Sequence, residues 1–188
     1  TYYLFNNLRE VICRKKKFIL VKAKPLISII TLNWNQTEIT CQFLESTRKL
    51  LYKHYEVLVC DMGSAADPTL QIITGNYPNT RILKTDPCND NGVNWAIKQA
   101  KGDFILLINN HTELTENTLD DLLAPFLTDK ILGVTCPKIR TIQKKNEIQY
   151  AGYNAMNKLT GRKTIIGHKK EDKGQYDIPL YTHGAYSG

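Results

Sequence analysis

Five consecutive apolar residues, Phe104 to Ile108, constrain the fold of this chain more than any other stretch. An unbroken apolar run of this length is typical of a central β-strand that is covered on both faces. The run passes directly into a polar turn, Asn109 to Glu113, at the carboxyl end of the predicted strand. In open α/β sheets, ligands bind at that edge. The turn therefore offers amide, imidazole and carboxylate groups to a ligand or a metal, or it is an ordinary polar loop before a helix that Thr115 or Asn117 caps.

Apolar strands and helical segments alternate along most of the chain. Strands that alternate with helices imply a mostly parallel, doubly wound sheet with helices on both faces. Residues 139–154 predict one or two further short strands, and the polar stretch after them either crosses the sheet or forms a surface loop. The predicted strands are 26–32, 55–60, 80–84, 104–108 and 131–135, and the predicted helices are 37–53, 94–100, 119–127 and one that begins at Asp67-Pro68.

Residues 1–24 differ from the predicted domain, which spans residues 25–188. Apolar residues through Val11 and Ile12 are spaced to form one helical face, and a basic cluster, 14–24, follows them. Such a segment binds an anionic membrane surface, at about 1 kcal/mol per basic residue, or packs as a helix on the domain with a solvated basic linker. No aromatic residue stands within the run 14–17, which disfavours nucleic-acid binding.

Charge and cysteine content narrow the classes of partner and cellular compartment that suit this chain. The net charge of +7 over 188 residues suits an anionic partner such as a nucleotide diphosphate or a membrane surface. The five cysteines lack CxxC spacing, which favours buried thiols in a reducing compartment over disulfides or a zinc site. No apolar run approaches the roughly 20 residues of a membrane-spanning helix. The chain begins at Thr1 and stops at Gly188 after a turn-rich stretch, so we expect a fragment that is truncated at its C-terminus.

Polar side chains follow four of the predicted strands, and in a parallel sheet these strand ends share one edge. Such an edge is expected to bind a polar ligand. Asp61 is the sharpest candidate, because a carboxylate there can accept hydrogen bonds from a nucleobase N–H or a ribose hydroxyl, while Gly63 permits a tight turn. Asp61 is otherwise a turn or helix-capping residue. The four clusters are Thr31/Asn33/Asn35, Asp61 to Ser64, Asp90 to Gly92 and Asn109 to Glu113.

Several common motifs are missing from this edge. The first strand is followed by neither GxGxxG nor GxxxxGK[ST], so the two commonest phosphate-binding loops lack support. A nucleotidyltransferase would need a glycine-rich loop with a basic residue there, and NWNQTEIT does not provide one. Ser64 and His111 do not form a nucleophile elbow, which disfavours a serine hydrolase.

In combination, three segments resemble the family-2 glycosyltransferases of GT-A fold: PLISIITLNWN, EVLVCDMGSAAD and NDNGVNWAIKQAKGDFILLINNHTEL. The segments GVTCPKI and IQYAG and the terminal YSG are similar to the bacterial rhamnosyltransferase-like branch. The resemblance covers roughly residues 25–188. It implies an inverting enzyme that transfers a sugar from a UDP- or dTDP-sugar to a hydroxyl of a saccharide or lipid-linked acceptor. Such an enzyme would act in polysaccharide or glycolipid assembly, in the cytoplasm or at the inner face of the membrane.

The same resemblance implies roles for individual residues. Asp61 matches the aspartate that contacts the base, and the segment from Asn109 to His111 matches a D-x-D-like motif for Mn²⁺ or Mg²⁺. A metal there neutralises diphosphate charge as the leaving group departs. The remaining matches are Thr31, Asn33 and Asn35 in the nucleoside pocket, and Asn91 and Asn94 beside the ribose and diphosphate.

The chain departs from the family pattern in two respects. His111 replaces the usual final aspartate, and an imidazole can ligate Mn²⁺ but supplies no negative charge and suits Mg²⁺ poorly. Metal affinity is then reduced, altered or lost, unless Asp103, Glu113 or Glu116 compensates. The family's general base lies downstream of the terminal Ser-Gly turn, so none is assigned here. The competing hypothesis is a catalytically degenerate nucleotide-binding or interaction module.

Overall fold

The computed structural model describes residues 11–14, 24–77, 79–84, 92–144 and 146–185. The strands are β1 (Val11–Arg14), β2 (Ile27–Asn33), β3 (Tyr55–Asp61), β4 (Thr80–Lys84), β5 (Phe104–Leu107), β6 (Val134–Thr135), β7 (Ile139–Arg140) and β8 (Ile148–Tyr150). The helices are α1 (Thr37–Arg48), α2 (Thr69–Thr74), α3 (Gly92–Gln99) and α4 (Thr118–Thr128). None of these described helices has the length and apolar character that a membrane crossing requires.

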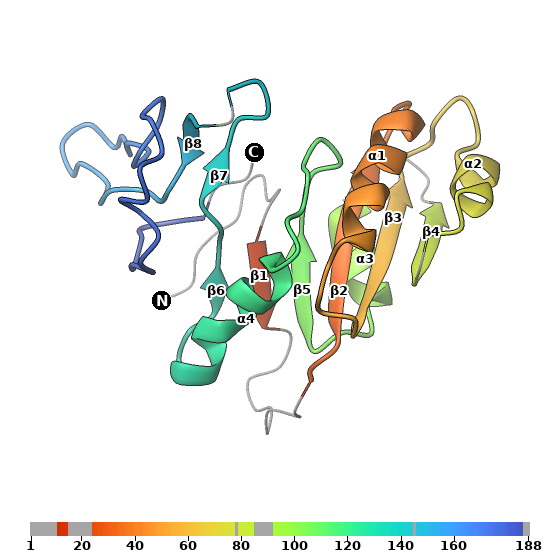
Figure 1. Ribbon diagram of the computed structural model, residues 1–188, viewed down its shortest axis with the longest axis horizontal. Coiled ribbons are helices and arrows are strands. Elements are labelled where there is room, and N and C mark those ends of the chain that lie inside the picture. The colour runs from red at the N-terminus through yellow and green to blue at the C-terminus, as the bar shows by residue number, and fades with distance from the viewer. Residues whose placement is uncertain (1–10, 15–23, 78, 85–91, 145, 186–188) are drawn as a thin grey trace.

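A six-stranded sheet in the order β4-β3-β2-β5-β1-β6 forms the centre of the molecule (Figure 1). Strands β2 to β5 are mutually parallel where they pair, and β1 runs antiparallel to both of its neighbours. The predicted mostly parallel sheet is confirmed. Strand 80–84 lies where it was predicted. The strands predicted at 55–60 and 104–108 differ by one residue at one end, and the strand predicted at 26–32 is shifted by one residue at both ends. Strand 131–135 is reduced to two residues.

The helix predicted at 37–53 ends at Arg48, and its hydroxyl side chains explain the early end. The Ser46 hydroxyl donates to the Phe43 carbonyl at 2.6 Å, and the Thr47 hydroxyl donates to the Leu44 carbonyl at 2.6 Å. Hydroxyl groups that bond to carbonyls of the preceding turn weaken and bend a helix. The chain therefore leaves the helix and buries Leu50 in the core.

The predicted amphipathic helix through Val11 and Ile12 is wrong, because these residues belong to strand β1. Ile12 pairs with Leu106 of β5 on one side and with Thr135 of β6 on the other. β-branched residues favour a pleated strand, and an edge strand presents unpaired backbone groups for another strand to satisfy. The rest of the predicted N-terminal segment, apart from Lys24, lies outside the described residues. The boundary at residue 25 stays a prediction, and β1 shares the sheet of the domain that follows it.

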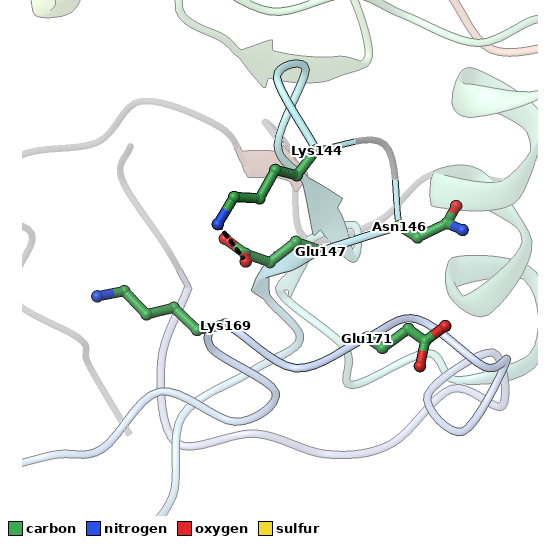
Figure 2. Close-up of a pocket in the computed structure, with 5 residues that line it drawn as sticks. All are labelled: Lys144, Asn146, Glu147, Lys169 and Glu171. Atoms are coloured by element: carbon green, nitrogen blue, oxygen red, sulfur yellow. Dashed lines mark hydrogen bonds and ion pairs between the residues drawn. The ribbon is translucent and has the colours of Figure 1, made fainter.

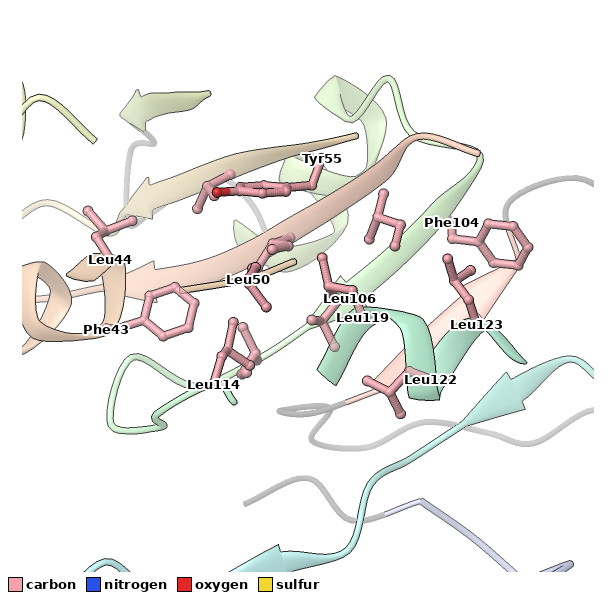
Figure 3. Close-up of a cluster of buried hydrophobic side chains, with 14 of the residues drawn as sticks. Phe43, Leu44, Leu50, Tyr55, Phe104, Leu106, Leu114, Leu119, Leu122 and Leu123 are labelled. Carbon is pink, nitrogen blue, oxygen red and sulfur yellow. The ribbon is translucent and has the colours of Figure 1, made fainter. Parts of the chain in front are cut away.

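Helices cover both faces of the sheet, as predicted. On one face, α1 and α4 bury a large apolar cluster that includes Phe43, Leu44 and Leu119 (Figure 3). On the other face, Ala96 of α3 packs in a smaller cluster with Ile30. The alternation of side chains along a strand decides the face, so Asn33 of β2 lies on the α1 face with Ile29.

The amino-terminal edge of the sheet is closed by a hydrogen-bonded corner around Ser28. Its hydroxyl donates to Glu56 Oε1 at 2.6 Å and accepts from the Gly102 N–H at 2.8 Å. Burial would raise the pKa of the Glu56 carboxyl, but the hydrogen bonds it accepts, that from Ser28 foremost, outweigh burial and lower this pKa. Gly102 is buried against this corner.

The segment after β6 forms a smaller unit around the β7–β8 pair, and these two strands confirm the short strands predicted within residues 139–154. Lys138 joins its distant turns, because the ammonium contacts Asp172 at 2.8 Å and also contacts Asp177. Burial would lower the pKa of Lys138, but its bonds to the two carboxylates raise this pKa above its ordinary value. The bond from Lys138 in turn lowers the pKa of Asp172.

Candidate functional site

Asn33 and Asp61 meet at the carboxyl ends of β2 and β3, where they are directly paired. The Asn33 Nδ2 donates to Asp61 Oδ1 at 2.7 Å and to the Ser64 hydroxyl at 3.1 Å. Asn33 is fully buried, and Asp61 is 5% exposed. Both side chains are therefore held in one orientation at the edge where the sequence placed a polar ligand.

The turn after β3 wraps around the Asp61 carboxylate. The Ser64 hydroxyl donates to Asp61 Oδ1 at 2.5 Å, and the Ser64 N–H donates to Oδ2 at 3.1 Å. Gly63 has φ +81°, a conformation that glycine adopts without strain. Asn35 ties this turn to the end of β2, since its N–H donates to the Ser64 hydroxyl at 2.9 Å and its Oδ1 accepts from the Ala65 N–H at 2.8 Å.

Thr40 of α1 connects this corner to the polar turn after β5. Its hydroxyl donates to Asn33 Oδ1 at 2.7 Å and accepts from Asn110 Nδ2 at 3.0 Å. Asn110 also donates to Gln36 Oε1 at 3.3 Å, and His111 Nε2 lies 3.0 Å from the same oxygen. A continuous set of hydrogen bonds thus runs from the turn after β3 to the turn after β5. We call it the rim network, and it comprises Gln36, Asn33, Thr40, Asp61, Ser64, Asn110 and His111.

Of the predicted site residues that the structure describes, Thr31, Asn94 and Asn109 lie outside the rim network, and Asn35 adjoins it through its bond to Ser64. Thr31 is only 1% exposed, and its hydroxyl has no hydrogen-bond partner among the described residues. Asn94 is exposed on α3, on the opposite face of the sheet. Asn109 precedes Asn110 by one residue, and its Oδ1 accepts only a long 3.3 Å bond from a backbone N–H among the bonds described. Asn91 is outside the described residues.

Thr40 and Gln36 were not predicted as site residues, whereas Ser64 and Asn110 were included only as members of the predicted polar clusters. Thr40 carried a detectable signal, because it shares helical spacing with the buried Phe43 and Leu44 and is the polar member of that stripe. Gln36 gave no comparable pattern.

The described residues fit a divalent metal ion poorly. They contain no group of three or more His, Cys, Asp or Glu side chains suited to hold one. His111 Nε2 faces the side-chain oxygen Oε1 of Gln36, and Glu113 pairs with Lys49 at 3.0 Å. Asp103 does not compensate, because it accepts from the Leu26 N–H at the opposite edge of the sheet. Hard divalent ions take several oxygen ligands, and this turn does not gather them.

A separate hollow lies in the segment after β6 (Figure 2). Its volume is about 690 Å³, and Lys144 and Glu147 form a 3.1 Å ion pair across part of it. Positive and negative side chains alternate around it, and it includes no residue of the rim network. The lining residues are Lys144, Asn146, Glu147, Lys169 and Glu171.

Two curated relatives are similar over most of this chain. The O-antigen biosynthesis protein RfbC of Myxococcus xanthus is 26% identical over 154 residues, which cover 79% of this chain and 11% of the relative. The chondroitin synthase of Escherichia coli is 26% identical over 148 residues, which cover 75% of this chain and 21% of the relative. This chain therefore spans a minor part of the length of these relatives.

A solved structure and a family profile complete the comparison. The mannosyltransferase PcManGT from Pyrobaculum calidifontis, solved with GDP-Man and Mn²⁺, superposes with a TM-score of 0.51 at 16% identity, over 56% of this chain and 33% of that one. This likeness concerns the fold alone, and the fold is GT-A-like. The profile described as "Glycosyl transferase family 2" matches residues 28–187. Because this match covers most of the sequence and includes every described residue of the rim network, the chain belongs to glycosyl transferase family 2.

Proposed function

We propose that the rim network binds the nucleoside part of a UDP- or dTDP-sugar, and that this chain is the donor-binding part of an inverting glycosyltransferase. The observation that carries the proposal is the fixed pair of Asn33 and Asp61, at the edge of a parallel sheet where polar ligands bind. Membership of the family and the relatives' roles in O-antigen and chondroitin synthesis support a function in polysaccharide assembly.

Trp34 is the candidate stacking surface for the base. It is 66% exposed, although it stands between Asn33 and Asn35, both held by hydrogen bonds to the turn after β3. The indole is therefore presented to solvent from a fixed backbone. Stacking on an aromatic side chain contributes about 1–3 kcal/mol per base. Asp61 beside it supplies the hydrogen-bonding carboxylate that distinguishes one base from another.

The diphosphate is expected near the start of α3. Gly92 begins this helix and packs against the Met62 side chain, next to the end of β3. Helix N-termini attract phosphate through their free N–H groups and dipole. Asn91 and Asn94 remain the predicted contacts to ribose and diphosphate. Because the described residues fit Mn²⁺ or Mg²⁺ poorly, the proposal assigns no step to a metal, and His111 as a ligand stays a prediction.

In the proposed reaction, the acceptor is a hydroxyl of a saccharide or of a lipid-linked intermediate. A base removes the hydroxyl proton, the oxygen attacks the anomeric carbon, and the nucleoside diphosphate leaves with the bonding electrons. The role of this chain is to hold the leaving group. We assign no general base, and the carboxylate of Asp172 is paired with Lys138. We place the enzyme in the cytoplasm or at the inner face of the membrane, where nucleotide sugars are the expected donors.

The second candidate function is a nucleotide-binding or interaction module without turnover. The observation in its favour is the turn after β5, where His111 bonds to Gln36 and no carboxylate cluster forms among the described residues. Asn33, Asp61 and Ser64 of the rim network can still hold a nucleotide if the turn after β5 binds no metal. The two candidates share a binding site and differ in catalysis.

A thermal-shift panel with UDP, dTDP, GDP and ADP, each with and without Mn²⁺, tests the proposal. A ligand at 100 times its dissociation constant adds about 2.7 kcal/mol of stability. We expect a pyrimidine diphosphate to raise the melting temperature more than either purine diphosphate. An assay of sugar transfer from the corresponding nucleotide sugar then separates enzyme from module. If no pyrimidine diphosphate stabilises the chain, the rim network is not the donor site.

Replacing Trp34 with alanine is expected to weaken UDP binding about five- to 150-fold, the equivalent of 1–3 kcal/mol of lost stacking. Trp34→Phe should retain most of the affinity, because phenylalanine also presents an aromatic face. Isothermal titration calorimetry measures both variants. Leu70→Ala is the matched control, since Leu70 is 73% exposed and lies on α2. Unchanged affinity in Trp34→Ala would remove the indole from the proposed site.

A further inference from the structure

Residues 154–164 form a hairpin that projects from the segment after β6, and we call it the 154–164 hairpin. Its two arms are joined by the Asn154 N–H, which donates to the Thr164 carbonyl at 3.0 Å, and by the Asn154 side chain, which donates to the Thr164 hydroxyl at 2.8 Å. Nearer the apex, the Asn157 N–H donates to the Arg162 carbonyl at 2.9 Å. The hairpin therefore has a defined backbone.

The apex of this hairpin satisfies three of its own backbone donors. Asn157 Oδ1 accepts from the N–H groups of Leu159 and Thr160 at 2.9 and 3.0 Å, and the Asn157 carbonyl accepts from the Gly161 N–H at 2.8 Å. Gly161 has φ +66°, which closes the turn. Backbone N–H groups that are already paired can approach an apolar medium without the large cost of an unpaired donor.

The side chains of the hairpin are apolar at the apex and basic around it. Leu159 is 95% exposed and Met156 is 55% exposed. Lys158 and Arg162 flank the apex and are exposed, and Lys163 lies one residue further along. No aspartate or glutamate occurs between residues 154 and 164. An aliphatic tip surrounded only by positive charge matches a surface that is apolar below a negatively charged layer.

We propose that the 154–164 hairpin binds the surface of an anionic lipid bilayer, with Leu159 and Met156 in the boundary between headgroups and acyl chains and with Lys158 and Arg162 on lipid phosphates. Apolar side chains beside lysine and arginine are the features that hold a protein segment at this interface. A nucleic acid is a poorer match, because the residues from 154 to 164 include no aromatic side chain on which a base can stack. A second copy of the chain would bring like charges together.

This inference is independent of the proposed nucleotide site, since bilayer binding requires no donor. The experiment is flotation of the purified chain with vesicles of phosphatidylglycerol and phosphatidylcholine, and with vesicles of phosphatidylcholine alone. We expect binding to the anionic vesicles that weakens with added salt. Leu159→Ser should lower the partition coefficient about tenfold, and Lys158→Glu with Arg162→Glu should lower it at least about twentyfold.

Two matched controls test whether the loss of vesicle binding depends on where in the chain the substitutions are made. Leu70→Ser removes an exposed leucine from α2, and Lys98→Glu with Lys101→Glu changes the net charge by the same amount on exposed residues elsewhere. We expect both controls to retain the wild-type partition coefficient. Equal losses in the controls and the hairpin variants would overturn the proposal, because they would show a response to charge and hydrophobicity in general.

A further variant separates loss of membrane contact from loss of folding, because it is expected to keep vesicle binding. Leu159→Trp should bind anionic vesicles at least as tightly as the wild type, with tryptophan emission that shifts to the blue, because tryptophan favours the membrane interface. Absence of vesicle binding overturns the proposal, and so does unchanged binding in Leu159→Ser, which would leave another segment as the membrane contact. Self-association that Leu159→Ser abolishes in sedimentation would make the hairpin a contact between copies instead.

Discussion

Replacing Thr40 with valine is expected to lower the free energy of unfolding by about 2–4 kcal/mol, because each buried polar group left without a partner costs about 1–3 kcal/mol. Valine keeps the shape of threonine but removes the hydroxyl that joins Asn33 to Asn110. Asn33 Oδ1 then loses the hydrogen bond described for it, while Asn110 keeps only its longer bond to Gln36. Urea unfolding followed by circular dichroism measures the change.

Thr40→Ser is the matched control for this prediction. Serine keeps the hydroxyl and removes one methyl group, so we expect a loss of only about 1 kcal/mol. The two variants should also differ in UDP affinity, with Thr40→Val the weaker, since Asn33 helps to orient Asp61. Equal stability of the two variants would mean that the hydroxyl does not hold the rim network together.

Replacing Gly102 with alanine is expected to destabilise the protein by about 3 kcal/mol or more, at the upper end of the range for overpacking. A Cβ atom there would lie 2.6 Å from the Ser28 backbone nitrogen and 2.7 Å from the Phe104 carbonyl oxygen. Both obstacles are backbone atoms of paired strands, so they cannot rotate away. Thermal and urea unfolding both measure the loss.

The same substitution at Gly133 provides the control. A Cβ on Gly133 would meet nothing within 4 Å. We therefore expect Gly133→Ala to remain within about 1 kcal/mol of the wild type. If Gly102→Ala were as stable as Gly133→Ala, the close approach between Gly102 and the strand ends would not exist in solution.

Local pattern predicted most of the sheet, because its strands are strongly apolar. The run from Phe104 lies at the centre of the sheet as predicted, and its buried residues account for the continuous pattern. Strand β1 was missed because Val11 and Ile12 fit either a helical face or a strand. Only pairing with β5, which is remote in sequence, decides between them.

Only part of the candidate site was predicted, because the rest depends on contacts between elements that are distant in sequence. Asn33 and Asp61 end two strands that pair in parallel, so their approach follows from the order of the elements. The choice of Asn109 came from the family motif, whereas Asn110, in the turn after β5, is the residue that donates to Thr40. A hydrogen bond between a helix and a distant strand end depends on tertiary packing, which no local sequence pattern encodes.

A ¹H–¹⁵N correlation spectrum recorded during a titration with UDP locates the binding site residue by residue. We expect shifts of the Trp34 indole N–H and of the Asn35, Ser64 and Ala65 amides, which join the turn after β3 to the end of β2. Shifts confined to the hollow near Lys144, or a spectrum unchanged at saturating UDP, would contradict the assignment of the nucleotide site to the rim network.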